Sequence, residues 1–264
     1  MKKVLLSVLG VWTIAFFSPS AIAQKQVSNS QGSMTWTSKS KEAKKLYATG
    51  LYHILNVERE QAYQAFKAAV DADPGFTLPL AFLSNLSAGE TRKAFAKRAQ
   101  GSATNKSEGE ALFASLTDEK NTPESRREIW SKLHVLYPND RVIGHFYAIT
   151  RATPEERMSA ATAYNQQFPE EPAMYNMLGY YYLTDKNDNA KAKEYFEKYI
   201  QLYPDGANPY DSMGEFYLTT GDKVNAEKYY TLALEKYPFM VSAVQAIEQI
   251  TAEKKKAEQT DKKQ

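Results

Sequence analysis

The stretch from residue 210 to residue 238 reads YDSMGEFYLTTGDKVNAEKYYTLALEKYP. Its small, aromatic and closing residues keep a fixed spacing, and they are Tyr210, Met213, Gly214, Tyr217, Ala226, Tyr230, Ala233 and Pro238. The same order of residue types occurs in residues 175–204 and again in residues 46–74. A pattern that returns in this way indicates a repeat architecture, in which each unit packs against the next one.

The distance between the glycine and the closing proline is nearly constant from unit to unit. It is 24 positions in 50–74 and 24 positions in 214–238. In 179–204 it is 25 positions, so this unit holds one extra residue, which we place in the turn 186–189. Several residues matching at fixed spacing in three units is a strong signal for one shared structural unit.

The pattern resembles the tetratricopeptide repeat, a helix–turn–helix unit of about 34 residues. The small residue of the first helix lets the second helix approach, and the alanine of the second helix occupies the same tight crossing. The aromatic residue four positions later lies on the same helix face, and the proline ends the unit. The resemblance implies an all-α fold, namely a right-handed α-solenoid of about six such repeats plus a C-terminal capping helix.

The repeat domain that we expect covers residues 41–253, with strong matches in repeats one, five and six and weaker ones between them. Its units are 43–76, 77–106, 107–140, 140–171, 172–206 and 207–240. Apolar residues at helical spacing then indicate a helix that closes the stack, and they are Met240, Val244, Ile247 and Ile250. The polar segment 24–40 is interpreted as a linker, and 254–264 as a charged, disordered tail.

Residues 1–23 have the three parts of a secretory signal peptide. Lys2 and Lys3 form the positive start, residues 4–17 are apolar, and residues 21–23 read Ala-Ile-Ala, a small-x-small cleavage site. A site of this type is typical of an exported bacterial protein, so we expect the mature chain to be periplasmic or secreted. An uncleaved anchor helix is the alternative, although the apolar run is shorter than the about 20 residues of a membrane span.

Composition excludes several classes of site and partner. The chain contains no cysteine, which rules out disulfides, a thiolate nucleophile and a lipid anchor on an N-terminal cysteine. Removal of residues 1–23 takes away two of the 33 basic side chains and none of the 31 acidic ones, so the mature chain is formally neutral. A nucleic-acid-binding protein would carry a basic footprint instead.

Motifs for catalysis or cofactor binding are missing. The three histidines, His53, His134 and His145, do not have the i, i+4 spacing of a metal site, and no HExxH motif occurs. The phosphate-binding patterns GxxxxGK[ST] and GxGxxG and the nucleophile pattern GxSxG are absent as well. We therefore expect a protein that is not an enzyme, with no catalytic, cofactor-binding or metal-binding residues.

The resemblance also implies which side chains face the concave groove of the solenoid. In this family the fifth and ninth positions of the first helix of a repeat tend to do so. In repeats four to six these positions carry Arg141, His145, Asn176, Tyr180, Asp211 and Glu215. Such a groove is basic at one end and acidic at the other, with an aromatic anchor between them. The alternative is that these are ordinary exposed helix residues.

The favoured hypothesis is an exported, non-catalytic scaffold whose concave groove binds a peptide segment or helix of another envelope protein. A known clamp of the family, which grips the C-terminal carboxylate of a chaperone, is disfavoured because the matching positions carry Tyr47 and Leu51. The alternative is a structural subunit of a larger cell-envelope assembly that uses its convex faces. An enzyme or small-ligand binder is a third reading that the missing motifs disfavour. The sequence leaves the partner and the oligomeric state open.

Overall fold

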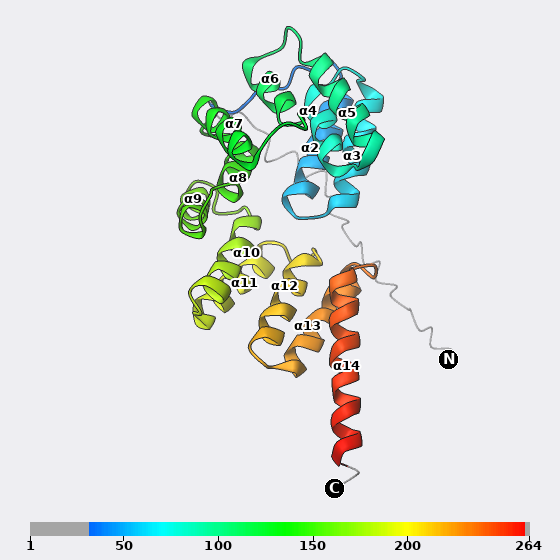
Figure 1. Cartoon of the computed structure of the whole chain (residues 1–264), viewed down its shortest axis with the longest axis vertical. Coiled ribbons are helices and arrows are strands. Elements are labelled where there is room, and N and C mark those ends of the chain that lie inside the picture. Colours follow the sequence, from blue (N-terminus) through cyan, green and yellow to red (C-terminus); the bar gives the residue numbers. More distant parts are fainter. Residues whose placement is uncertain (1–31, 262–264) are drawn as a thin grey trace, which may run out of the picture.

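The computed structural model describes residues 32–261, and the regular secondary structure of this range is entirely helical. The predicted signal peptide (1–23) and the first part of the predicted linker lie outside the described residues. The helices, labelled in Figure 1, are α2 (Lys41–Leu55), α3 (Arg59–Ala72), α4 (Thr77–Leu86), α5 (Gly89–Ser102), α6 (Glu108–Ser115), α7 (Pro123–Leu136), α8 (Arg141–Ile149), α9 (Pro154–Gln167), α10 (Ala173–Tyr180), η1 (Tyr181–Asp185), α11 (Asn189–Leu202), α12 (Asn208–Thr219), α13 (Lys223–Lys236) and α14 (Val241–Asp261).

The helices pair into hairpins that match the predicted repeats one by one. The first hairpin is α2–α3 and the sixth is α12–α13, with α14 after it. In Figure 1 the hairpins follow one another along a curved path, so that the described chain has the outline of a letter C. The prediction of an α-solenoid built from helix–turn–helix repeats is therefore confirmed.

The signature glycines lie where the two helices of a hairpin cross. Each of them faces an aromatic ring of the second helix, in the pairs Gly50–Phe66, Gly179–Phe196 and Gly214–Tyr230. A Cβ atom added to these glycines would lie 2.4, 2.6 and 2.9 Å from the respective rings. Packed interiors do not accommodate such approaches, so the ring occupies the space that any side chain at the glycine position would need.

The fourth residue of the second helix is an alanine in three of the repeats and an arginine in the other three. In repeats one, five and six the fourth residue of the second helix is a fully buried alanine, Ala62, Ala192 and Ala226. In repeats two, three and four the fourth residue of the second helix is an arginine, Arg92, Arg126 and Arg157. The first helices of these three hairpins are short, with 10, 8 and 9 residues.

Two of these arginines bind carbonyl groups just after the short first helix ends. Arg126 Nη1 donates to the carbonyl oxygen of Leu116 at 2.9 Å. Arg157 Nη1 donates to the carbonyl oxygens of Arg151 at 3.0 Å and of Ala152 at 3.1 Å. These carbonyls belong to the connection between the two helices, so each arginine joins the second helix of its hairpin to that connection. Repeats three and four match the sequence pattern weakly because an arginine with this role, Arg126 or Arg157, occupies the position at which the pattern has alanine.

Repeat five accommodates its extra residue in the π-helix η1, which directly continues α10. The backbone N–H of Lys186 donates to the carbonyl of Tyr181, five residues earlier, at 3.2 Å. A π-helical turn holds one residue more than an α-helical turn does. The sequence-based placement of the extra residue in the turn 186–189 is therefore wrong, because the helix absorbs it before the turn begins.

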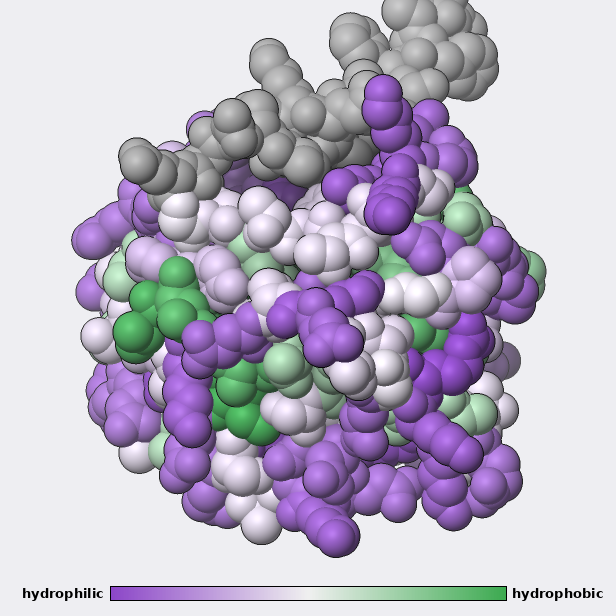
Figure 2. Space-filling view, turned by 90° about the horizontal axis from the view of Figure 1, so that it is seen from above, coloured by the Kyte–Doolittle hydropathy of each residue, from purple (hydrophilic) through white to green (hydrophobic). Residues whose placement is uncertain are grey.

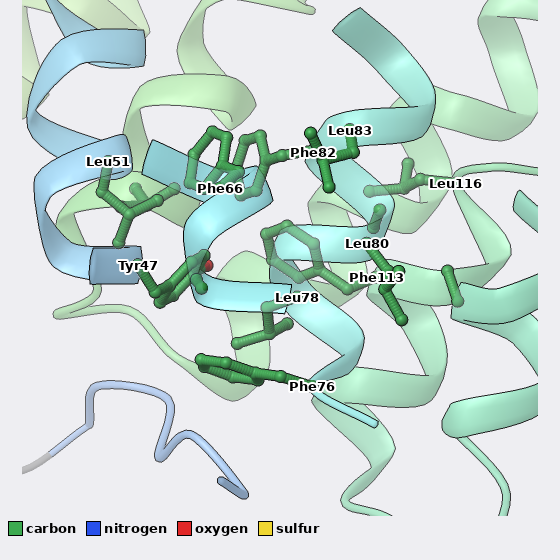
Figure 3. Close-up of a cluster of buried hydrophobic side chains, with 14 of the residues drawn as sticks. Tyr47, Leu51, Phe66, Phe76, Leu78, Leu80, Phe82, Leu83, Phe113 and Leu116 are labelled. Atoms are coloured by element: carbon green, nitrogen blue, oxygen red, sulfur yellow. The ribbon is translucent and has the colours of Figure 1, made fainter. Parts of the chain in front are cut away.

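The largest hydrophobic core joins the first four repeats. The rings of Phe66 and Phe82 stack with their centroids 4.7 Å apart, and Tyr47 packs edge-on against Phe76 at 5.1 Å (Figure 3). Tyr47 and Leu51, at the positions of the family's carboxylate clamp, are only 1% and 3% exposed. These two side chains belong to the core and do not form a surface that could grip a ligand.

Residues 32–40, the described part of the predicted linker, run across several repeats without regular secondary structure. The backbone N–H of Met34 donates to Asp140 Oδ2 at 3.1 Å, which ties the segment to the start of α8. Trp36 lies edge-on against Tyr47 with the ring centroids 4.8 Å apart. The segment therefore joins the first repeat to the fourth.

The helix α14 covers the open end of the stack and fully buries Ile250. An ion pair of 2.7 Å between Lys223 Nζ and Glu253 Oε2 holds it against the start of α13. We expected the repeat domain to end at residue 253 and a disordered tail to cover 254–264, whereas α14 continues to Asp261.

The turn between α2 and α3 contacts repeats five and six, far along the chain. The hydroxyl of Tyr203, at the end of α11, donates to Glu58 Oε1 at 2.5 Å. The hydroxyl of Tyr237, at the matching end of α13, donates to Glu60 Oε2 at 3.1 Å. The ring of Tyr52 lies edge-on to Tyr203 at 6.0 Å. The C-shaped path thus closes on itself at this point.

We expect Tyr203→Phe to loosen this closure, because it removes the donor that Glu58 accepts from. A hydrogen bond to a charged group contributes about 1.5–3 kcal/mol at most, and this one is only partly buried, so about 1–2 kcal/mol of unfolding free energy should be lost. Small-angle X-ray scattering should show a larger radius of gyration. Tyr210→Phe is the matched control, because that hydroxyl donates within its own turn, to Pro204 O. Identical scattering curves for the two variants would contradict the expectation.

Candidate functional site

Three of the six predicted groove residues meet at the junction of repeats five and six. The hydroxyl of Tyr180, the last residue of α10, donates to Glu215 Oε2 on α12 at 2.7 Å. Asp211 precedes Glu215 by four residues on α12, so the two carboxylates lie on one helix face one turn apart. Ser242 Oγ, at the start of α14, donates to Asp211 Oδ1 at 2.9 Å. One aromatic and two acidic side chains therefore share a site that three helices build.

Burial and mutual repulsion shape the electrostatics of this site. Burial raises the pKa of Asp211 first, the hydrogen bond from Ser242 opposes that rise, and the nearby charge of Glu215 adds to it. Burial also raises the pKa of Tyr180, and the charges of both carboxylates add to the effect. Two like charges that share a site favour the approach of a cation. The site is thus suited to a basic group.

Tyr180 also lines a cavity of about 150 Å³ between α9 and the α10–η1 helix. Met158 from α9 and Met177 from α10 supply apolar lining. Methionine side chains are flexible and polarisable, and they adapt to apolar groups of different shape. Arg157 and Asp185 lie on the polar side of the cavity. The cavity and the carboxylate cluster thus share the side chain of Tyr180.

The predicted basic end of the groove is neutralised in the structure. Arg141 Nη1 and Glu171 Oε1 form an ion pair of 2.5 Å, and the two side chains are only 16% and 10% exposed. His145 is 8% exposed, and burial, with a smaller contribution from the charge of Arg141, lowers its pKa to about 3. His145 is therefore uncharged at neutral pH, and Arg141 is balanced by Glu171.

Asn176, one turn before Tyr180 on α10, is partly buried. Its Oδ1 atom is buried and accepts no hydrogen bond from the described residues. Five of the six predicted residues thus form two groups: Tyr180, Asp211 and Glu215 in one, and Arg141 and His145 in the other.

Sequence reasoning missed the residues that complete these two groups. Glu171 lies in the turn before α10, Ser242 starts the capping helix, and Met158 belongs to the second helix of the preceding repeat. The groove pattern considers only the first helix of each repeat, so none of the three could be found by it. The acid at residue 171 was visible in the sequence, but its pairing with Arg141, 30 positions away, was not.

Other classes of site find no support among the described residues. Within 32–261 no group of three or more histidine, aspartate or glutamate side chains is placed to hold a metal ion. None of the helices in the same range combines the length and the apolar character that crossing a membrane requires.

Comparison with known proteins agrees with this geometry. A family model for the tetratricopeptide repeat matches residues 172–205, which contain α10, η1 and α11. Residues 172–205 therefore contain a tetratricopeptide repeat. It is similar in fold to yeast Tom70, with a TM-score of 0.53 and 12% identity over 88% of this chain and 53% of that one. It is also similar to the solved structure of the APC/C hetero-tetramer Cut9–Hcn1, with a TM-score of 0.52 and 15% identity over 87% of this chain and 45% of that one.

The present chain spans about half the length of these two solved chains, and at such low identity the likeness concerns the fold alone. No protein of curated function matches the sequence. Stacked helical repeats create extended surfaces that bind other proteins, so the fold is that of a protein–protein interaction scaffold. Its partner has to be argued from the side chains of this chain.

Proposed function

We propose that the protein is an exported, non-catalytic scaffold that binds a segment of another envelope protein at the junction of repeats five and six. The observation that carries this proposal is the cluster of Tyr180, Asp211 and Glu215. Its hydroxyl–carboxylate contact of 2.7 Å presents an oriented aromatic ring beside two acids. Buried aromatic anchors beside polar groups are the usual centres of binding energy in protein interfaces.

The chemistry of the site favours a partner segment with a basic residue next to an apolar one. The carboxylates of Asp211 and Glu215 would pair with a lysine or arginine. The cavity of about 150 Å³ beside Tyr180 would take the neighbouring apolar side chain. An amphipathic helix or an extended peptide presents two such side chains on one face.

Export is the second part of the proposal and rests on the sequence of residues 1–23. The positive start, the apolar stretch and the Ala-Ile-Ala site have the order of a cleavable signal peptide. The mature chain would then meet its partner in the periplasm or outside the cell.

We expect Tyr180→Ala to weaken binding of the partner about tenfold or more, as for an anchor residue that contributes at least about 1.4 kcal/mol. The partner should first be identified by placing the photo-crosslinking residue p-benzoylphenylalanine at position 180 in the native cell. Tyr175, on the same helix, packs towards Tyr195 with ring centroids 6.3 Å apart. Tyr175→Ala, and the same photo-crosslinker at position 175, are the matched controls. Equal adducts at the two positions would overturn the proposal.

A structural subunit that uses outer faces is the second candidate, and exposed apolar residues in the turn between α13 and α14 favour it. Phe239 and Val241, in the turn before α14 and at its start, are 76% and 65% exposed. From the end that carries α4 to α6, the surface is mainly hydrophilic with small separate apolar patches (Figure 2). Loss of partner capture in Phe239→Ser, with capture unchanged in Tyr180→Ala, would favour this candidate over the groove.

A further inference from the structure

A second cavity, of about 120 Å³, lies where the first helices of repeats one to four converge. Its walls come from α2, α4, α6 with the following Leu116, and α8, together with Arg59 of α3 and Trp130 of α7. It shares no residue with the site around Tyr180. A dry apolar cavity of about 150 Å³ is large enough for benzene. The present cavity is somewhat smaller, and its volume is close to that of one aromatic ring or one branched apolar side chain.

Four aromatic rings give this cavity a preformed shape. Trp130 and Phe146 stack with centroids 4.9 Å apart and planes 14° apart, and Phe113 stands edge-on to Trp130 at 5.2 Å. Phe82 contacts both Phe113 and Phe146, with centroid distances of 5.8 Å in each case. Rings that hold one another in this way need little rearrangement to receive an apolar group.

The polar residues of the cavity lie at its mouth and are open to contact. Arg59 and Asn85 are both exposed. The two acids next to Arg59 in sequence are engaged elsewhere. Glu58 accepts from Tyr203 and contacts His53 Nδ1 at 2.5 Å. Glu60 accepts a hydrogen bond from repeat six. The Arg59 guanidinium itself has no ion pair with a described acidic residue.

We propose that this cavity binds an aromatic side chain of a partner polypeptide that is followed by a glutamate or an aspartate. The aromatic side chain would enter between Phe82 and Trp130, where aromatic pairs add to the free energy of burial. The adjacent carboxylate would meet the guanidinium of Arg59 and the amide of Asn85, which suits the donor geometry of both groups. The inference goes beyond the proposed function, because that function uses acidic residues of repeats five and six for a basic partner segment.

The test uses the mature protein and the peptide acetyl-Gly-Phe-Glu-Gly-amide. We expect a saturable shift of the Trp130 indole N–H signal in NMR spectra, with a dissociation constant on the order of 1 mM. Replacing phenylalanine with alanine in the peptide should weaken binding more than about tenfold, through the loss of ring burial. Replacing glutamate with glutamine should weaken it about fivefold, as expected for one exposed ion pair.

Variants of the protein locate the site. Arg59→Gln should reduce affinity for the glutamate peptide about fivefold and leave affinity for the glutamine peptide unchanged. Ala81→Leu, which fills a 2% exposed lining position, should abolish binding. Arg98→Gln is the matched control, because this α5 arginine donates to Pro74 O outside the cavity. Since Arg59 is exposed, its variant keeps the test meaningful even where Ala81→Leu fails to fold.

A Trp130 signal that does not move with wild-type protein would overturn the inference. So would equal binding of the glutamate and glutamine peptides, or equal affinities of the Arg59→Gln and Arg98→Gln variants. Tyr180→Ala should not change the affinity for these peptides. A negative result at the cavity therefore does not contradict the proposal for the Tyr180 cluster, and a negative result for that cluster does not contradict the proposal for the cavity.

Discussion

Replacing Gly50 with leucine is expected to destabilise the first repeat by about 1–3 kcal/mol, the usual cost of overpacking a tight core. The reason is the ring of Phe66, which lies 2.4 Å from the position that the new Cβ atom would take. Phe66 is fully buried and stacks on Phe82 in the largest core, so the ring has no free space to move into. Urea unfolding followed by circular dichroism should show the lower midpoint.

A double-mutant cycle makes this expectation specific to the glycine–ring contact. Phe66→Ala alone should cost about 3–5 kcal/mol, because it leaves a cavity in the core. In the double variant the leucine at position 50 points into that cavity. The loss should therefore be smaller than the sum of the two single losses, by about 1–3 kcal/mol.

Gly101→Leu is the matched control for this cycle. Gly101 is also helical, in α5, but a Cβ added there would meet nothing within 4 Å. Leucine should be tolerated at this position or raise stability by up to about 1 kcal/mol, since glycine is a poor helix former. Additive losses in the cycle, or equal effects of Gly50→Leu and Gly101→Leu, would show that the crossing is not as tight as the structure has it.

The stability of the protein is expected to fall on mild acidification because of His145. In the unfolded chain a histidine takes up a proton near pH 6.5, whereas in the folded protein burial lowers the pKa of His145 to about 3. Between these values the unfolded state binds more protons, so acidification favours unfolding. From pH 8 to pH 5 this single group should remove about 2 kcal/mol of unfolding free energy.

The measurement compares the wild-type protein with His145→Leu in urea unfolding at pH 8, 6.5 and 5. Carboxylates that also titrate in this range are common to both proteins and cancel in the difference. The variant should become more stable relative to the wild type by about 2 kcal/mol as the pH falls from 8 to 5. The difference in stability at pH 8 serves as the baseline, because leucine also removes a buried Nδ1 atom that has no hydrogen-bond partner among residues 32–261. A constant difference across the three pH values would refute a buried, uncharged His145.

Part of the candidate site followed from the repeat pattern. A position within a helix determines which face a side chain occupies, and on this basis all six residues were expected along one groove. The structure brings Tyr180 into contact with Glu215, whereas the expected basic end at Arg141 and His145 is neutralised. The ion pair with Glu171 and the burial of His145 come from the neighbouring turn and helix, and a pattern of spacings within one repeat does not contain them.

The sequence by itself determined the hairpins, their number and the crossing points marked by Gly50, Gly179 and Gly214, because these depend on residues that are close in the chain and recur at a fixed period. Only the tertiary structure decided how residues 32–40 join repeats one and four, how Tyr203 reaches Glu58, and which rings enclose the cavity at Trp130. These contacts join residues up to 145 positions apart, and their geometry depends on the summed rotation of every hairpin between them. A pattern of residues within one repeat does not contain this summed rotation. The fold could therefore be predicted from the sequence, whereas the contact between repeats one and five and the cavities could not.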